Sequence, residues 1–143
     1  TTNGVWLADS NFAGGGGDGT DLDTRQFGRQ GTISNNTVLL TLNNILSDTS
    51  PDLCSFNFYF RRLSWTNSNN AGVFNIRVWK YTTLSLTTKS IVYDYVTSGG
   101  RAGFMDFDVN LPMDKGESFY LEVTTVGNPR PADLNVIISL RQR

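Results

Sequence analysis

Apolar residues recur at every second position along much of the chain after residue 36. Phe56, Phe58 and Phe60 alternate with polar neighbours, and the same period returns in Phe74–Val78, Met105–Leu111, Phe119–Val123 and Leu134–Leu140. Alternation of this kind is typical of antiparallel strands that have one buried face and one face in water. Two further segments are candidate strands: Gly4–Ala8 and Thr37–Leu46. With them the pattern predicts about eight strands.

Turn-forming residues separate the predicted strands. Three segments rich in Asn, Gly or Pro are expected to be loops: Asn67–Gly72, which we interpret as a hairpin loop, Ser98–Gly103 and Pro112–Gly116. Asn128–Pro131 is a fourth, because its prolines cannot donate to a central ladder. The predicted fold is an all-β antiparallel sandwich of the jelly-roll type.

The length of 143 residues fits a single domain. Residues 1–36 are expected to form an N-terminal segment that contains Gly, Asp and a short strand and packs on, or leads into, the sandwich. Residues 37–143 are predicted to form that sandwich. Within the first part, Asn11–Ser34 lacks periodicity and is expected to be a long excursion from the fold.

Composition and charge narrow the function classes. The chain has 12 Lys and Arg against 13 Asp and Glu, a formal net charge of -1, so it lacks the basic field that nucleic-acid binding requires. No apolar run approaches the roughly 18 residues of a membrane helix, and no membrane insertion is expected. Cys54 is the single cysteine and is predicted to be a buried thiol.

Catalysis is not expected. The chain has no His, which removes the usual general base and the Ser-His-Asp and Cys-His arrangements. Asp106 and Asp108 lie two positions apart on one strand face, about 7 Å from each other. Glycosidases place their carboxyl groups on opposite sides of a scissile bond, so we interpret this pair as acids on a soluble outer face.

The stretch Gly14–Asp23, GGGGDGTDLD, combines glycines with three aspartates. Asp18, Asp21 and Asp23 offer the carboxylate oxygens that calcium prefers. The segment also matches the start of the calcium-binding nonapeptide of RTX β-helices, but it occurs once and has Asp23 where that motif has a large apolar residue. Two interpretations stay open: an isolated calcium site, or a mobile or trimer-lining glycine loop with solvated acids.

A set of aromatic residues is expected to face water once the core has been assigned. Tyr59 and Trp79 fall opposite the inward positions of their strands, and Trp65 comes just before the Asn67–Gly72 segment. Flat rings beside Asn, Asp and Arg stack on sugar rings while the polar groups bind the hydroxyls. We therefore predict these rings as ligand-binding residues, with packing against a sheet, a subunit or a loop as the alternative for each: Tyr59, Trp65, Trp79, Tyr81, Tyr93 and Tyr95.

Several traits of the whole chain occur together: Asn, Thr and Gly are abundant, Lys is rare, the strands are short, a glycine-rich segment leads in, and a strand, Val136–Leu140, lies at the end. In these traits the chain resembles the receptor-binding heads of phage tail fibres and viral spikes. The resemblance implies a non-catalytic homotrimer, at the virion surface or otherwise extracellular, that binds a cell-surface glycan or protein. It also implies receptor contact through distal loops such as Asn67–Gly72 or Ser98–Gly103.

Two other functions fit the same pattern. One is a carbohydrate-binding module of a secreted enzyme, a class with exposed aromatics and often a structural calcium. The other is a structural protein that decorates or builds a capsid. A stable trimer would favour the attachment head, a monomer with calcium the module, and assembly without glycan affinity the structural protein.

Overall fold

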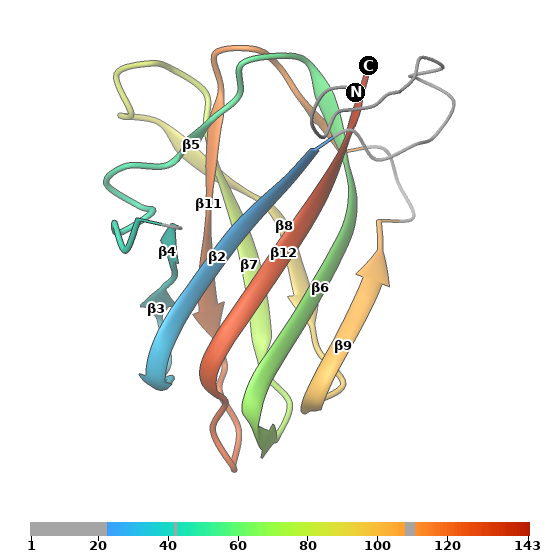
Figure 1. Cartoon of the computed structure of the whole chain (residues 1–143). Helices are drawn as coiled ribbons and strands as arrows, with labels where there is room; N and C mark the ends of the chain where they lie inside the picture. The colour runs from blue at the N-terminus through green and yellow to red at the C-terminus, as the bar shows by residue number, and fades with distance from the viewer. Residues whose placement is uncertain (1–22, 42, 108–110) are drawn as a thin grey trace.

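The computed structural model describes residues 23–41, 43–107 and 111–143, and Figure 1 shows them as strands and connecting segments. No helix occurs in this described part, so the predicted all-β class is confirmed. The long strands are β2 (Asp23–Thr32), β6 (Phe58–Ala71), β7 (Asn75–Tyr81), β8 (Lys89–Val96), β9 (Gly100–Asp106), β11 (Ser118–Thr124) and β12 (Ala132–Gln142). The strands of two residues are β3 (Thr37–Val38), β4 (Leu40–Thr41), β5 (Asp52–Leu53) and β10 (Pro112–Met113).

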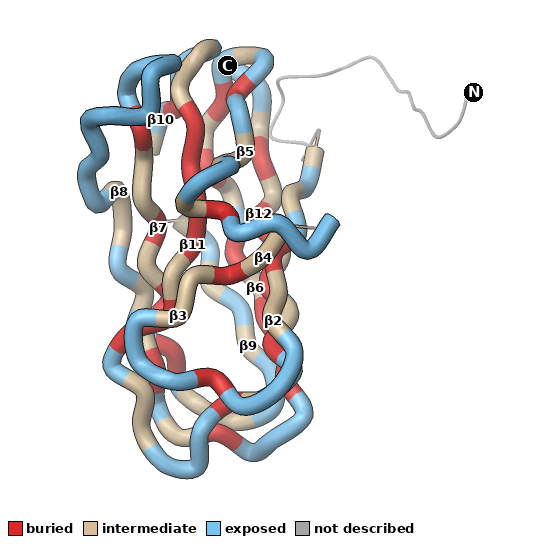
Figure 2. The backbone as a smooth tube through the Cα atoms, turned by 90° about the vertical axis from the view of Figure 1, so that its left-hand side faces the viewer, coloured by how far each residue is buried: buried red, intermediate tan, exposed pale blue. Residues whose placement is uncertain are grey.

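The strands form two antiparallel sheets. The front sheet has the order β10-β6-β12-β2-β4, and β9 also pairs with β6. The back sheet has the order β3-β11-β7-β8, and β5 also pairs with β11. Figure 1 views the front sheet from its outer side, and Figure 2, turned by 90°, shows both layers from the side. No described segment forms a helix long and apolar enough to cross a membrane.

The hydrophobic core lies between the two sheets. In β12 the burial pattern follows the predicted alternation, with Leu134, Val136, Ile138 and Leu140 at 2% exposure or less. Phe119 of the back sheet contacts Phe60 of the front sheet with ring centroids 5.1 Å apart. Such aromatic contacts contribute about 0.5–1.5 kcal/mol each beyond the area that they bury. Period-two patterning therefore located the inward faces of β7, β11 and β12 correctly.

The interpretation of Asn11–Ser34 as an excursion was wrong over Asp23–Thr32. These residues form β2, which lies between β12 and β4 in the front sheet. Phe27 is the one buried hydrophobic side chain of this strand, so side-chain periodicity gives almost no signal there. Backbone pairing with β12, from Thr32 to Asp23, holds the strand in place. Residues 1–22, with the candidate strand Gly4–Ala8, lie outside the described residues.

The predicted hairpin loop Asn67–Gly72 was also wrong, because β6 continues to Ala71. The amide of Asn67 donates to the carbonyl of Gly100 at 2.9 Å, and Ala71 pairs with Gly100. The chain then crosses to β7 in the other sheet, so the two strands do not form a hairpin. A Cβ at Gly72 would lie 2.6 Å from the carbonyl oxygen of Asn128, which explains the glycine at this crossing.

The other predicted loops and the candidate strand Thr37–Leu46 are confirmed in part. Ser98–Gly103 is a loop only up to Gly99, since β9 begins at Gly100, and Pro112 and Met113 belong to β10. Asn128–Pro131 is a connection, as predicted. The candidate strand Thr37–Leu46 is divided between the sheets: β3 pairs with β11 and β4 with β2, with buried Leu39 between them.

Candidate functional site

Trp65 lies in the core rather than on a wet face. It is 2% exposed and its ring meets Phe74 at 5.1 Å, edge to face. The reason is a bulge in β6. Leu140 of β12 pairs with Phe60, but the preceding residue of β12, Ser139, pairs with Arg62, so β6 has one extra residue at this point. The extra residue reverses the parity of the strand, so the buried positions change from even to odd numbers. The expectation of an exposed ring was therefore wrong for Trp65.

Tyr93 and Tyr95 also point to the core. They pair directly with Val78 and Ile76, which are fully buried, and directly opposed residues share a face of the sheet. The ring of Tyr93 meets Phe107 at 5.1 Å. The pairing of β7 with β8 shifts between Val78 and Trp79, so odd-numbered Ile91 lies opposite outward-facing Trp79 while odd-numbered Tyr93 lies opposite buried Val78. The expectation that Tyr93 and Tyr95 face water was therefore wrong.

Tyr81 and Trp79 lie in one cluster on the outer side of the back sheet. Tyr81 is 8% exposed, and its hydroxyl donates to the carbonyl of Asp48 at 2.9 Å, so a loop covers it. Trp79 is half-buried: its ring stacks on Tyr120 at 6.1 Å and 10°, and its N–H donates to Glu122 at 2.9 Å. We call Trp79, Tyr81, Lys89, Tyr120 and Glu122 the back-face cluster.

Lys89 closes the back-face cluster from the solvent side. Its Nζ lies 4.7 Å from the centroid of the Trp79 ring and donates to the hydroxyl of Tyr120 at 2.9 Å. This hydrogen bond raises the pKa of Lys89 above its ordinary value. The rings of this cluster are thus paired mainly with one another and with a cation, and little open ring surface remains.

Tyr59 is half-buried on the outer side of the front sheet, on the other layer from Trp79. Its ring lies 5.6 Å from the guanidinium of Arg141 and 5.5 Å from that of Arg143. Arg143 is also paired with Asp114 and donates to the carbonyl of Met113 at 2.9 Å. The six predicted aromatic residues therefore do not form one site, and Tyr59 and Trp79 alone among them keep partly open outer positions.

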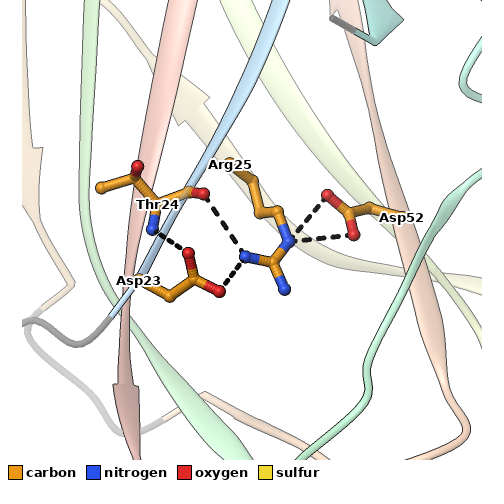
Figure 3. A network of polar contacts seen from close by, with 4 residues as sticks. All are labelled: Asp23, Thr24, Arg25 and Asp52. Atoms are coloured by element: carbon orange, nitrogen blue, oxygen red, sulfur yellow. Dashed lines mark hydrogen bonds and ion pairs between the residues drawn. The ribbon is translucent and has the colours of Figure 1, made fainter. Parts of the chain in front are cut away.

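Of the three candidate calcium ligands, Asp23 is described, and Asp18 and Asp21 lie outside the described residues. Asp23 accepts a hydrogen bond from the N–H of Thr24 at 2.8 Å and is paired with Arg25, as Figure 3 shows. Arg25 also donates from Nε to Asp52 at 3.0 Å and so links β2 to β5. Burial raises the pKa of Asp52 despite the neighbouring guanidinium.

Within the described ranges no three His, Cys, Asp or Glu side chains form a group that could hold a metal ion. The calcium site at the three aspartates stays a prediction. Cys54 is 2% exposed, which confirms the buried thiol, and burial raises its pKa to about 12. Asp106 lies on the exposed face, as predicted, and Asp108 is outside the described residues.

The outer side of the front sheet carries two adjoining hollows, and together we call them the front-face groove. The larger, about 660 Å³, lies over β2 and β12 and is bordered by the segment that follows β4. The smaller, about 410 Å³, lies over β6, β9 and β12. Asn135 lines both. Their lining includes Gln26, Leu40, Leu46, Ser64, Thr66, Phe104, Asn135 and Ile137.

Amides, hydroxyls and one exposed ring line much of the front-face groove, and the larger hollow is also lined by Arg29 and Asp133. Gln26 donates from its amide to Asn135 at 2.6 Å across the β2–β12 pair. Phe104 is 64% exposed, and the guanidinium of Arg62, which is paired with Asp106, lies 5.0 Å from its centroid. No residue that lines the smaller hollow is charged. A flat ring beside neutral amides and hydroxyls suits a polar ligand that also has apolar faces.

Part of this site could have been found from the sequence. Met105 faces inward opposite Leu63, so its neighbour Phe104 must face outward, and the period of two already contains this information. The same reasoning places Asn135 outside, between buried Leu134 and Val136. Gln26 gave no signal, because β2 itself was not recognised as a strand.

No protein-family model matches this chain, and no curated protein matches it at a significant level.

Proposed function

We propose that the chain is a non-catalytic recognition domain that binds a cell-surface glycan in the front-face groove. In this proposal its two sheets form a β-sandwich of the jelly-roll type, and the parent is a phage or viral attachment protein. The observation that supports it best is the position of Phe104. This residue is 64% exposed beside a hollow whose lining includes amide, hydroxyl and small side chains.

The chemistry of the groove favours a sugar over other polymers. The ring of Phe104 offers a flat surface for the C–H face of a sugar, and Asn135, Gln26, Ser64 and Thr66 offer donors and acceptors for hydroxyls. Nucleic acid would need a row of cations to neutralise its phosphates, and the smaller hollow has none. The formal net charge of -1 points the same way.

A glycan array with two matched aromatic variants tests this proposal. Phe104→Ala removes the exposed ring of the groove, and Trp79→Ala removes the half-buried ring of the back-face cluster. We expect Phe104→Ala to lose most of the array signal, because stacking on an aromatic ring is worth about 0.5–1.5 kcal/mol or more. Trp79→Ala should keep the signal. The reverse result would move the site to the back sheet, and an array without signal for the unaltered chain would refute glycan recognition.

The attachment-protein setting is a separate part of the proposal. Its support is the composition of the chain and its resemblance to phage and viral heads. Such a head is a homotrimer on the virion surface, so light scattering should give three times the chain mass of 15.8 kDa. A monomer whose melting temperature rises with calcium would favour the carbohydrate-binding module instead. Assembly without glycan affinity would favour the capsid or decoration protein.

A further inference from the structure

The floor of the front-face groove continues along β12 beyond the two hollows. Asn135, Ile137, Ser139 and Arg141 alternate with the buried residues of this strand and so share its outer side. Two residues of a strand advance about 6.8 Å, which puts Arg141 about 20 Å from Asn135 along one straight row. A ligand that follows the strand from the groove therefore reaches a guanidinium.

The neighbouring strand β6 carries a second row beside the first. Its pairing with β12 sets Ser64 opposite Ile137, Arg62 opposite Ser139 and Tyr59 opposite Arg141. Opposed side chains in an antiparallel pair lie about 5 Å apart and face the same way. Along β6 and β12 the face thus changes from neutral hydroxyl and amide side chains at the smaller hollow to an aromatic ring and guanidinium groups at the far end.

Arg141 differs from its basic neighbours in what it contacts. Arg62 is paired with Asp106 and Arg143 with Asp114. The contact of Arg141 is the ring of Tyr59, 5.6 Å from its guanidinium carbon, and no carboxylate of the described residues forms an ion pair with it. A guanidinium held against a ring keeps N–H groups available, and their fork matches a carboxylate or a sulfate.

We propose that the ligand of the front face is an acidic glycan whose carboxylate or sulfate binds Arg141 while its neutral sugars lie over the groove and Phe104. This inference rests on the proposed glycan binding and specifies its chemical class. Tyr59 is the positioning residue, because its ring supports the guanidinium. The larger hollow is lined by one cation and one anion, Arg29 and Asp133, and Arg29 already donates to the carbonyl of Val38 at 3.1 Å. The smaller hollow beside Phe104 has no charged residue, so we assign the preference for an acidic group to Arg141.

Matched pairs of glycans test the inference with two charge variants. Each pair has one backbone with and without its acidic group: a sialylated glycan against its desialylated form, and a sulfated glycan against its desulfated form. The two pairs also distinguish a carboxylate from a sulfate. Arg141→Gln removes the proposed contact, and Arg130→Gln removes the same charge from an exposed loop that does not line the groove.

The unaltered chain should bind the acidic member of at least one pair about tenfold more tightly than the neutral member. Arg141→Gln should bring both members to the affinity of the neutral one, while Arg130→Gln should keep the preference. Arg141→Lys keeps the charge without the fork and should retain part of the preference. It also provides a second variant if Arg141→Gln does not fold.

Two results would overturn the inference: equal binding of both members by the unaltered chain, or an undiminished preference in Arg141→Gln. In either case the glycan proposal itself would stand, because neutral sugars would still bind. Absence of binding to every glycan would instead refute the proposed function, and the inference with it. The failure of one is therefore distinguishable from the failure of the other.

Discussion

The contact between Gly103 and Trp65 gives a sharp test of how the core is packed. A Cβ added at Gly103 would lie 2.8, 2.9 and 3.0 Å from three atoms of the Trp65 indole. Trp65 cannot move away easily, because it is 2% exposed and its ring is already in edge contact with Phe74. Gly103→Ala should therefore overpack the space between β6 and β9.

The expected cost follows from two opposing effects. Overpacking a well-filled core costs about 1–3 kcal/mol. The replacement of glycine by alanine in an extended strand returns about 0.4–1 kcal/mol through the unfolded chain. Taking the middle of each range, the net loss in the free energy of unfolding is about 1.3 kcal/mol. For a chain of this length that corresponds to a fall in melting temperature of roughly 4 °C.

Urea unfolding followed by circular dichroism, together with a thermal melt, measures this loss. Ala102→Ser is the matched control, because Ala102 precedes Gly103 and is exposed on the other side of the same strand. Its free energy of unfolding should stay within about 0.5 kcal/mol of the unaltered chain. An unchanged slope of the urea transition would show that both variants unfold from a similar native state.

A second substitution tests the stated cause. Trp65→Phe removes the three indole atoms that the new methyl group would meet, along with an N–H that has no hydrogen-bond partner among the described residues. The loss in the free energy of unfolding of the double variant should therefore be about 0.5–3 kcal/mol smaller than the sum of the losses of the two single variants. Full stability of Gly103→Ala alone, or strict additivity in the double variant, would refute this account of the packing.

Two other properties of single side chains can be measured directly. Burial raises the pKa of Cys54 to about 12, so roughly one thiol in ten thousand is ionised at about pH 8. A thiol reagent should therefore label Cys54 only after unfolding, and rapid labelling of the folded chain would contradict its burial. Hydrogen bonds from Gly31 and Ser68 lower the pKa of Asp133 below its ordinary value of 3.8 in the folded chain. Their contribution to the free energy of unfolding is therefore complete above pH 3.8, and it is lost as the pH falls through the lower pKa of the folded state. Asp133→Asn should consequently lose less stability on acidification in a series of melts than the unaltered chain, and an identical acid limb would show that these bonds do not matter.

The sequence predicts the fold well wherever strands are regular and half-buried. In β12 the buried positions alternate as predicted, because the side-chain period of a strand is two. In β7 and β11 the period gives the inward positions, but Tyr81 and Tyr120 are also buried, on the outer side of the sheet. The prediction fails at the bulges, where one extra residue reverses the parity. In β6 this reversal turns Trp65 inward. A similar shift in the pairing of β7 with β8 places Tyr93 on the inward side of the back sheet, while Trp79 stays on the outer side. A bulge is set by pairing with a distant strand, which a local pattern does not report.

Strands held mainly by their backbone are missed for a related reason. Most side chains of β2 are polar, and the strand takes its place through hydrogen bonds to β12 on one side and β4 on the other. The last residues of β6 likewise look like a loop, since Asn67, Asn69 and Asn70 are typical of turns. Asn67 instead uses its amide to bond Gly100 across the sheet, a contact that depends on the tertiary fold.

The same bulges bear on where a ligand could bind. By turning Trp65, Tyr93 and Tyr95 inward, they leave few rings on the outer faces, and those of the back-face cluster are covered by Lys89 and one another. Phe104 is different, because the residue is 64% exposed. A single exposed apolar residue is ordinary in a soluble protein. What distinguishes Phe104 is that it borders an uncharged hollow that continues through Asn135 into a larger one, which is why we propose its ring as the surface on which a ligand stacks.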